Sequence, residues 1–271
     1  MSEAKADNGK WRDLSVRLAS AVVLIPLVLA DVWLGAWWFA GLVGLLGVLV
    51  AREYARMVRP GDGLYFMLMM LAGLAGAVLL PLYGFMASLA VVGLVFVASL
   101  VYLLLQAERN GFAFLGIAYV GLPCLALMEL RFSGSAGAIA VYWLFAVVWG
   151  ADSLAYFAGR MIGGPKLWPA VSPKKTWAGL GGAIIGAILA GALVLQLGGS
   201  AITGNLLVAA GALAVIEQGG DFYESALKRR SGRKDSGSLI PGHGGILDRV
   251  DGLMFAAIGS LALMMVGFVS W

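Results

Sequence analysis

The sequence is poor in charged residues: Asp, Glu, Lys and Arg make up only 13% of its 271 residues, whereas 61% are hydrophobic. A water-soluble globule needs more polar side chains than this to cover its surface, so the composition excludes that class. The apolar residues form runs of about 18 to 22, the length at which a helix crosses a bilayer core roughly 30 Å thick. We therefore expect an all-α integral membrane protein.

Cysteine and histidine are nearly absent, with one of each in the chain. Cys124 lies inside an apolar run with no partner for a disulfide, so we interpret it as a packing residue. One histidine cannot build a His-based zinc site. The chain also lacks a Walker loop, because Lys175-Thr176 has no upstream glycines at the required spacing, and it has no GxGxxG motif after a predicted strand. These absences argue against zinc enzymes, P-loop ATPases and dinucleotide-binding folds.

Nine apolar segments follow one another, and we predict that each one spans the membrane. They cover approximately residues 17–34, 36–51, 64–82, 86–106, 112–128, 138–159, 177–197, 203–218 and 252–270. Connectors rich in Lys and Arg alternate with connectors that hold only Arg131, which is the positive-inside pattern. We therefore predict that the N-terminus and the two long polar loops face the cytoplasm, at a plasma (inner) membrane, and that Trp271 lies on the far side.

Two features of the apolar segments leave alternatives open. The first segment also resembles a cleaved signal peptide, because Val28-Leu29-Ala30 follows a basic start, although the charge alternation favours an uncleaved helix. Several glycines permit close approach of helices, within the chain or in a homodimer. They are Gly41, Gly44, Gly47, Gly182 and Gly186.

The first polar stretch begins inside a span. Asp152 lies in the C-terminal half of the sixth segment, and an ionisable group at membrane depth is costly enough to suggest a function. The following loop contains Ser172-Pro173-Lys174-Lys175-Thr176, in which two ammonium groups and two hydroxyls could surround a phosphate. The residues alone leave two interpretations open: an anion site, or lysines that only mark the inner face.

The second polar stretch, residues 217–252, holds five carboxylates and six Lys or Arg between residues 221 and 251. Asp221 precedes Lys228 at helical spacing, and Asp248 and Asp251 are three residues apart, so each pair shares a helix face. Three aspartates at a membrane surface suit magnesium completed by substrate phosphates. With the basic side chains they predict phosphoryl or nucleotidyl transfer, and surface ion pairs are the alternative.

A glycine-rich turn lies between these acidic residues. Gly242, Gly244 and Gly245 would let backbone amides approach an anion. His243, between them, would either assist proton transfer or contact phosphate, or would simply be an exposed turn residue.

This stretch resembles the signature of the phosphatidate cytidylyltransferases, also called CDP-diacylglycerol synthases. The signature has the form S-x-[apolar]-K-R-x4-K-D-x-[small]-x2-[apolar]-[P/G]-x-H-G-G-[apolar]-x-D-R-[apolar]-D. The matching residues are Ser225, Lys228, Arg229, Lys234, Asp235, Pro241, His243, Gly244, Gly245, Asp248, Arg249 and Asp251. Asp152 and the loop 172–176 are similar to the family's second polar segment. The resemblance covers most of the chain, and its specific motifs lie within residues 149–252.

The resemblance implies transfer of a cytidylyl group from CTP to phosphatidic acid, which gives CDP-diacylglycerol and pyrophosphate for phospholipid biosynthesis. It implies that magnesium, with a second cation as an option, binds to Asp221, Asp248 and Asp251. The catalytic set it implies is Asp221, Lys228, Asp248, Arg249 and Asp251. The substrate contacts it implies are Asp152, Ser172, Lys174, Lys175, Thr176, Arg229, Lys234, Asp235, His243, Gly244 and Gly245. The partners would be CTP, phosphatidic acid and membrane lipids, and no nucleic acid is expected.

No internal repeat or long linker divides the chain, so we predict one membrane domain, residues 1–271. Residues 1–135 would supply N-terminal helices, and residues 136–271 would form the catalytic part with the signature at 225–251. Two other functions remain as alternatives: a lipid or polyprenol kinase, and a membrane transporter whose path is lined by Asp152 and the basic loops. The transporter is disfavoured because the chain lacks symmetric halves.

Overall fold

The computed structural model describes residues 22–239 and 244–271, most of which are helical. A helix over Val22–Leu34 comes first. The elements that follow are α2 (Ala36–Val58), α3 (Gly63–Leu74), the π-helical turn η1 (Ala75–Leu79), α4 (Leu80–Tyr83), α5 (Phe85–Leu105), α6 (Gly111–Arg131), the short 3₁₀ helix η2 (Gly134–Ala136), α7 (Gly137–Met161), β1 (Lys166–Trp168), β2 (Ser172–Thr176), α8 (Trp177–Leu197), α9 (Gly204–Arg230) and α10 (Leu247–Met265).

Six helices in the described part of the chain are long and apolar enough to cross a membrane. They are Ala36–Val58, Gly63–Tyr83, Phe85–Leu105, Gly111–Arg131, Gly134–Met161 and Trp177–Leu197. The predicted all-α membrane protein is therefore confirmed, but the predicted count of nine spans is not. The helix Val22–Leu34 is shorter than a span, and the predicted segment continues into residues outside the described ones. Helix α9 runs past the predicted end at residue 218 and α10 begins before residue 252, so both include polar signature residues.

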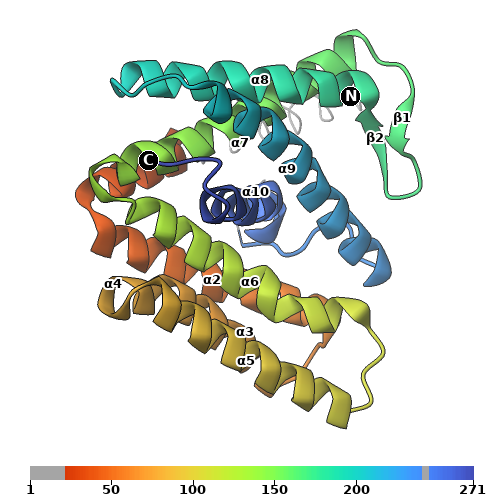
Figure 1. Ribbon diagram of the computed structural model, residues 1–271. Coiled ribbons are helices and arrows are strands. Elements are labelled where there is room, and N and C mark those ends of the chain that lie inside the picture. The colour runs from red at the N-terminus through yellow and green to blue at the C-terminus, as the bar shows by residue number, and fades with distance from the viewer. Residues whose placement is uncertain (1–21, 240–243) are drawn as a thin grey trace.

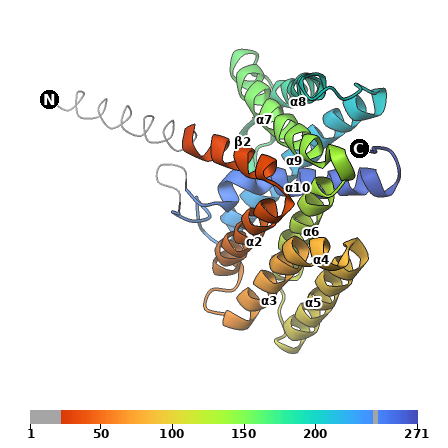
Figure 2. The ribbon, with the colours of Figure 1, turned by 90° about the vertical axis from the view of Figure 1, so that its left-hand side faces the viewer.

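Helix α10 occupies the centre of the molecule (Figure 1). One group of helices, α2, α3, α5 and α6, lies on one side of it, and α7, α8 and α9 lie on the other. Figure 2 shows the same arrangement from a perpendicular direction, and α10 contacts α2, α6, α7 and α9. The first turn of α10 carries Asp248 and Arg249, and Asp251 follows in the next turn. The fold therefore places the end of the signature between the two groups of helices.

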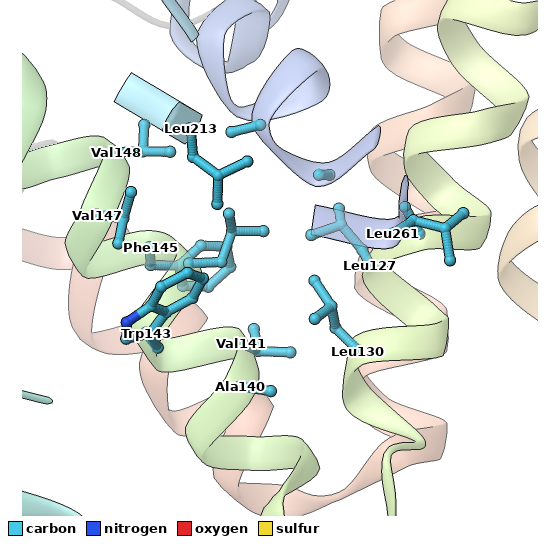
Figure 3. Packing of buried hydrophobic residues seen from close by; sticks show 14 of the residues in the cluster. Leu127, Leu130, Ala140, Val141, Trp143, Phe145, Val147, Val148, Leu213 and Leu261 are labelled. Carbon is cyan, nitrogen blue, oxygen red and sulfur yellow. The ribbon is translucent and has the colours of Figure 1, made fainter. Parts of the chain in front are cut away.

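Buried apolar residues join the two groups. Figure 3 shows Trp143 and Val147 of α7 facing the same space as Leu127 of α6, Leu213 of α9 and Leu261 of α10. All five are almost completely buried. Since α6 belongs to the N-terminal part and α9 to the C-terminal part, packing in this core fixes one part against the other.

Helices α7 and α8 approach each other closely through glycines. A Cβ atom at Gly182 would lie 2.5 Å from the carbonyl oxygen of Leu154, and one at Gly186 would lie 2.9 Å from the Leu154 Cβ. The predicted close approach at these two glycines is confirmed. It also occurs at Gly47, whose Cβ would lie 3.0 Å from Cys124 Sγ, whereas Gly41 has open space around it among the described residues.

Charged residues join the loop between α2 and α3 to the loop between α5 and α6. Arg59 Nε donates to Asp62 (2.6 Å) and Arg59 Nη1 donates to Glu108 (2.5 Å). Burial raises the pKa of Asp62, but hydrogen bonds, first among them that from the Tyr65 amide, outweigh it and hold the pKa below its usual value. The amide of Asn110 donates to Glu108 and lowers the pKa of that carboxyl. Both acids therefore stay ionised at neutral pH, and their carboxylates accept backbone amides in and beside these loops.

The packing of α7 on α8 gives a prediction with a matched control. Gly186→Ala places a methyl group against α7 and should lower the free energy of unfolding by about 1–3 kcal/mol, the usual cost of overpacking. Gly181→Ala, on the open side of the same helix, should instead be neutral or raise stability by up to about 1 kcal/mol, because alanine favours helix. Thermal unfolding in detergent gives the melting temperature of each variant, and we expect Gly186→Ala to melt below Gly181→Ala. Equal melting temperatures would contradict the close contact.

Candidate active site

Three carboxylates, one from α7 and two from α9, lie close together. Asp152 of α7 and Glu217 and Asp221 of α9 bring ligand oxygens within 4.8 Å of one another. Glu217 and Asp221 share a face because they are four residues apart on a helix. Glu217 is 1% exposed, and neither of its side-chain oxygens has a hydrogen-bond partner in the described part of the chain. A buried carboxylate without a partner is costly unless a cation compensates it.

The chemistry of this cluster fits a hard divalent cation. All three groups offer oxygen atoms, which are the ligands that Mg²⁺ prefers, and two or three carboxylates leave coordination positions for water or phosphate. Helix α10 closes the cluster from behind: a Cβ at Gly252 would lie 2.6 Å from Glu217 Cγ. A side chain at residue 252 would push against Glu217, so the close packing of α10 on α9 helps to hold the Glu217 side chain in place.

A cavity of about 340 Å³ opens next to the three carboxylates. Asp152 and Asp221 line it together with Lys174, Lys175 and Arg160, so acidic and basic groups face the same space. Lys175 forms an ion pair with Asp221 in this structure. A cavity that combines carboxylates with ammonium groups can hold a metal and a phosphate side by side.

The loop predicted over residues 166–176 is an antiparallel hairpin of β1 and β2. Trp177 donates its amide to the carbonyl of Pro165 (3.1 Å) and closes the base of the hairpin. The ring of Trp168 packs 5.7 Å from Phe222 on α9. Thr176, expected to contact substrate, uses its hydroxyl to accept the Gly179 amide (3.0 Å) as the N-cap of α8. The hairpin is thus anchored at both ends next to the cavity.

A second cavity, of about 350 Å³, has five Lys or Arg residues among the nine that line it, and we call it the basic cavity. Lys174 lines this cavity as well as the first, so the two are neighbours. The predicted substrate-binding residues that line it are Ser172, Lys174, Arg229 and Lys234, and they are joined by Ser225, Lys228 and Arg233. Arg229 Nε also donates to the carbonyl of Val171 (2.6 Å), which holds α9 against the hairpin. The structure therefore brings the two polar stretches of the sequence together.

Lys228 and Asp248 form a separate ionic group with Glu224. Lys228 Nζ lies 2.5 Å from Glu224 and 2.7 Å from Asp248. The other oxygen of Asp248 accepts the amides of Ser236 (3.0 Å) and Gly245 (2.9 Å) and lies 2.9 Å from the Ser236 hydroxyl. In this structure Asp248 is therefore occupied by protein donors, and its predicted role as a metal ligand stays a prediction.

The remaining signature residues lie close to these groups. The carboxyl group of Asp251 interacts with Asp221, and its backbone packs against Gly220 of α9. Arg249 is exposed on the first turn of α10. Asp235 is exposed beside a further cavity, and Gly244 adopts a positive φ of 86° that favours glycine. His243 lies outside the described residues, so neither of its interpretations is tested.

Sequence reasoning missed two acidic residues. Glu217 comes one turn before Asp221 at the end of an apolar segment, so its position at membrane depth was a usable signal. Glu53 gave no such signal, because it stands between Arg52 and Arg56 and resembles a solvated connector. In the structure it is 6% exposed and contacts the segments around Asp248.

Known proteins resemble this chain along almost its whole length. A family model described as "Cytidylyltransferase family" matches residues 15–267. The chain belongs to the cytidylyltransferase family. It is 36% identical over 248 residues to a phosphatidate cytidylyltransferase of Brucella abortus biovar 1 (strain 9-941), covering 90% of this chain and 91% of that protein. The protein of the same name from Bacillus subtilis (strain 168) is 34% identical over 262 residues, covering 90% and 94%.

The family match extends beyond the signature. It includes the N-terminal helices that supply Glu53 as well as the helices that carry the carboxylates. The similarity to a phosphatidate cytidylyltransferase of Helicobacter pylori (strain ATCC 700392 / 26695) is 39% over 162 residues, 59% of each chain. The resemblance inferred from residues 149–252 is confirmed, and the cytidylyltransferase family accounts for both parts of the chain.

The ionic group around Lys228 gives the second prediction. Glu224 and Asp248 have side chains only 2% and 6% exposed, so Lys228→Met would leave two buried carboxylates without their cation. We expect a loss of about 3–5 kcal/mol in the free energy of unfolding. Adding Glu224→Gln should restore part of it, since one uncompensated charge is removed, with a coupling of about 0.5–3 kcal/mol in a double-mutant cycle. Additive effects on chemical unfolding would refute the buried ionic group.

Proposed function

We propose that this protein is a phosphatidate cytidylyltransferase that makes CDP-diacylglycerol and pyrophosphate from CTP and phosphatidic acid. The observation that carries the proposal is the buried Glu217, without a partner in the described part of the chain, beside Asp152 and Asp221. One cavity with basic side chains adjoins this cluster and the basic cavity adjoins the first through Lys174, in a chain that belongs to the cytidylyltransferase family. The combination supports a metal-assisted reaction between two phosphate-bearing substrates.

Asp152, Glu217 and Asp221 would hold Mg²⁺, which when bound polarises the α-phosphorus and neutralises charge on the leaving pyrophosphate. Asp251 remains a proposed ligand because its carboxyl interacts with Asp221. Asp248 would have to exchange Lys228 for the ion before it could bind it. A second cation remains part of the proposal, since more carboxylates lie here than one ion requires.

The basic side chains would position the substrates and stabilise negative charge. A phosphatidate oxygen forms a bond to the α-phosphorus of CTP while the bond from that phosphorus to the pyrophosphate oxygen breaks. Since the attacking oxygen is already an anion, no strong general base is needed. Lys174 lies between the two cavities, so it would contact phosphates of both substrates. Lys228, Arg229 and Lys234 would hold the triphosphate in the basic cavity.

The cavity beside Asp152 suits a lipid head group. Tyr156 and Leu180 line it together with the acids, and Tyr156 is 58% exposed. An apolar wall next to charged groups would let acyl chains stay in the leaflet while the phosphate reaches the lysines. Together with the placement of basic connectors, this supports an active site at the cytoplasmic face of the inner membrane.

The test of the function is pyrophosphate release by the purified protein in detergent, with Mg²⁺, phosphatidic acid and each of CTP, ATP, GTP and UTP in turn. We expect release only with CTP, dependent on lipid and metal, and a CDP-lipid detectable by mass spectrometry. Transfer of phosphate from ATP to a lipid would instead establish a kinase. Folded protein that consumes no nucleotide would refute the proposal and favour a transporter.

The metal ligands can be tested independently. Glu217→Gln and Asp221→Asn should weaken Mn²⁺ binding, followed by electron paramagnetic resonance, and lower kcat by more than the roughly 10–100-fold typical of losing an outer-shell partner. Glu129→Gln, in α6 and away from the cluster, serves as the control for removing a half-buried carboxylate. If Asp248→Asn abolishes Mn²⁺ binding while Glu217→Gln does not, the ligand set that the sequence implies is correct, and the set proposed here around Glu217 is wrong.

A further inference from the structure

A carboxylate from the N-terminal helices binds the two segments that flank the signature's glycine turn. Glu53 of α2 accepts the amide of Ile246 (3.1 Å) on one oxygen and the amide of Leu247 (2.9 Å) on the other. The hydroxyl of Ser236 lies 3.0 Å from the second oxygen. Glu53 is only 6% exposed, so these contacts are shielded from water.

The contacts of Glu53 continue to Asp248. The Ser236 hydroxyl lies 2.9 Å from Asp248 Oδ2, so it can donate to either carboxylate in turn, and the Ser236 amide donates to Asp248 at 3.0 Å. Asp248 in turn pairs with Lys228 of the basic cavity. A continuous chain of polar contacts therefore runs from α2, in the N-terminal group of helices, to a residue expected to bind substrate phosphate.

Two glycines make room for this arrangement. A Cβ at Gly237 would lie 2.9 Å from the Glu53 carboxyl carbon, and a Cβ at Gly245 would lie 2.7 Å from the Gly237 amide. The backbone thus folds around the Glu53 carboxylate with no space for other side chains. Such a fit fixes position as well as adding hydrogen bonds.

Helix capping explains part of the arrangement. Helix α10 has no capping side chain at its N-terminal residue Ile246, and a carboxylate that accepts amides there also interacts favourably with the helix dipole. Capping alone, however, would need only the Ile246 and Leu247 amides. The additional contact with Ser236 joins the segment before the glycine turn to the segment after it, and Asp248 binds both of them.

We propose that Glu53 is a positioning residue for the reaction, which holds Ser236 and the first turn of α10 so that Asp248 orients Lys228 toward substrate. This inference rests on the proposed cytidylyltransferase function. It assigns the N-terminal helices a direct part in building the active site.

The first experiment measures kinetics. Glu53→Gln replaces one acceptor oxygen with an NH₂ group that faces a backbone amide, so kcat should fall about 10–100-fold, as for other residues that orient an active-site group, with a smaller change in KM for CTP. Glu53→Asp keeps the charge and should recover part of kcat. The control is Asp62→Asn, which also removes a carboxylate that accepts a backbone amide, but at the N-terminus of α3. It should lower the melting temperature and leave kcat of the folded protein unchanged.

The second experiment does not depend on activity. Leu247 is completely buried and its amide donates to Glu53, so in a Cys124→Ala background a cysteine introduced by Leu247→Cys reacts with a thiol reagent only when this segment opens. Adding Glu53→Gln should accelerate labelling about fivefold or more, whereas adding Asp62→Asn should not.

An unchanged labelling rate, or a kcat that Glu53→Gln and Asp62→Asn leave equally unaffected, would overturn the inference. If the wild-type protein shows no cytidylyltransferase activity, the proposed function fails, and the labelling experiment still decides whether Glu53 holds the loop.

Discussion

The ion pairing of buried carboxylates with the few cations beside them is the constraint on which the rest of this structure depends. An isolated charge in an apolar surrounding costs several kcal/mol, so each buried acid needs a partner. Glu224 and Asp248 share Lys228, Asp221 pairs with Lys175, and Glu53 takes two backbone amides. Glu217 has no such partner in the described part of the chain. This buried carboxylate, next to that of Asp152, is therefore the main support for the proposed cation site.

Helix packing determines where these charges can meet. Helix α7 contacts both α8 and α9, and its packing on α9 brings Asp152 close to Glu217. Glycines allow the close approach of α7 to α8 and of α10 to α9, where Gly252 lies against the Glu217 side chain. The small residues that stabilise these helix pairs therefore also hold the two helices that carry the carboxylates.

The sequence predicted the helical membrane fold well, because apolar runs and charged connectors are local signals. It also identified Asp152, Asp221 and the Lys174-Lys175 pair, which the structure brings to one cavity. It could not predict that Thr176 caps a helix or that residues 166–176 form a hairpin, since both depend on contacts with Gly179, Pro165 and α9. The role of Glu53 could not be predicted for the same reason. Its partners lie more than 180 residues away in the chain.

The N-terminal helices contact the helices of the candidate site in more than one place, which argues that they do more than anchor the chain. Next to Glu53, the Tyr54 hydroxyl lies 2.5 Å from that of Tyr223 on α9, and the Tyr119 ring of α6 stacks on Tyr223 at 5.1 Å. Tyr223 precedes Glu224, the buried partner of Lys228. A shift of α2 or α6 would therefore move α9 and the ionic group together. Helices from residues 1–135 therefore contact the signature near both of its ends, and the family match, which begins at residue 15, includes these helices.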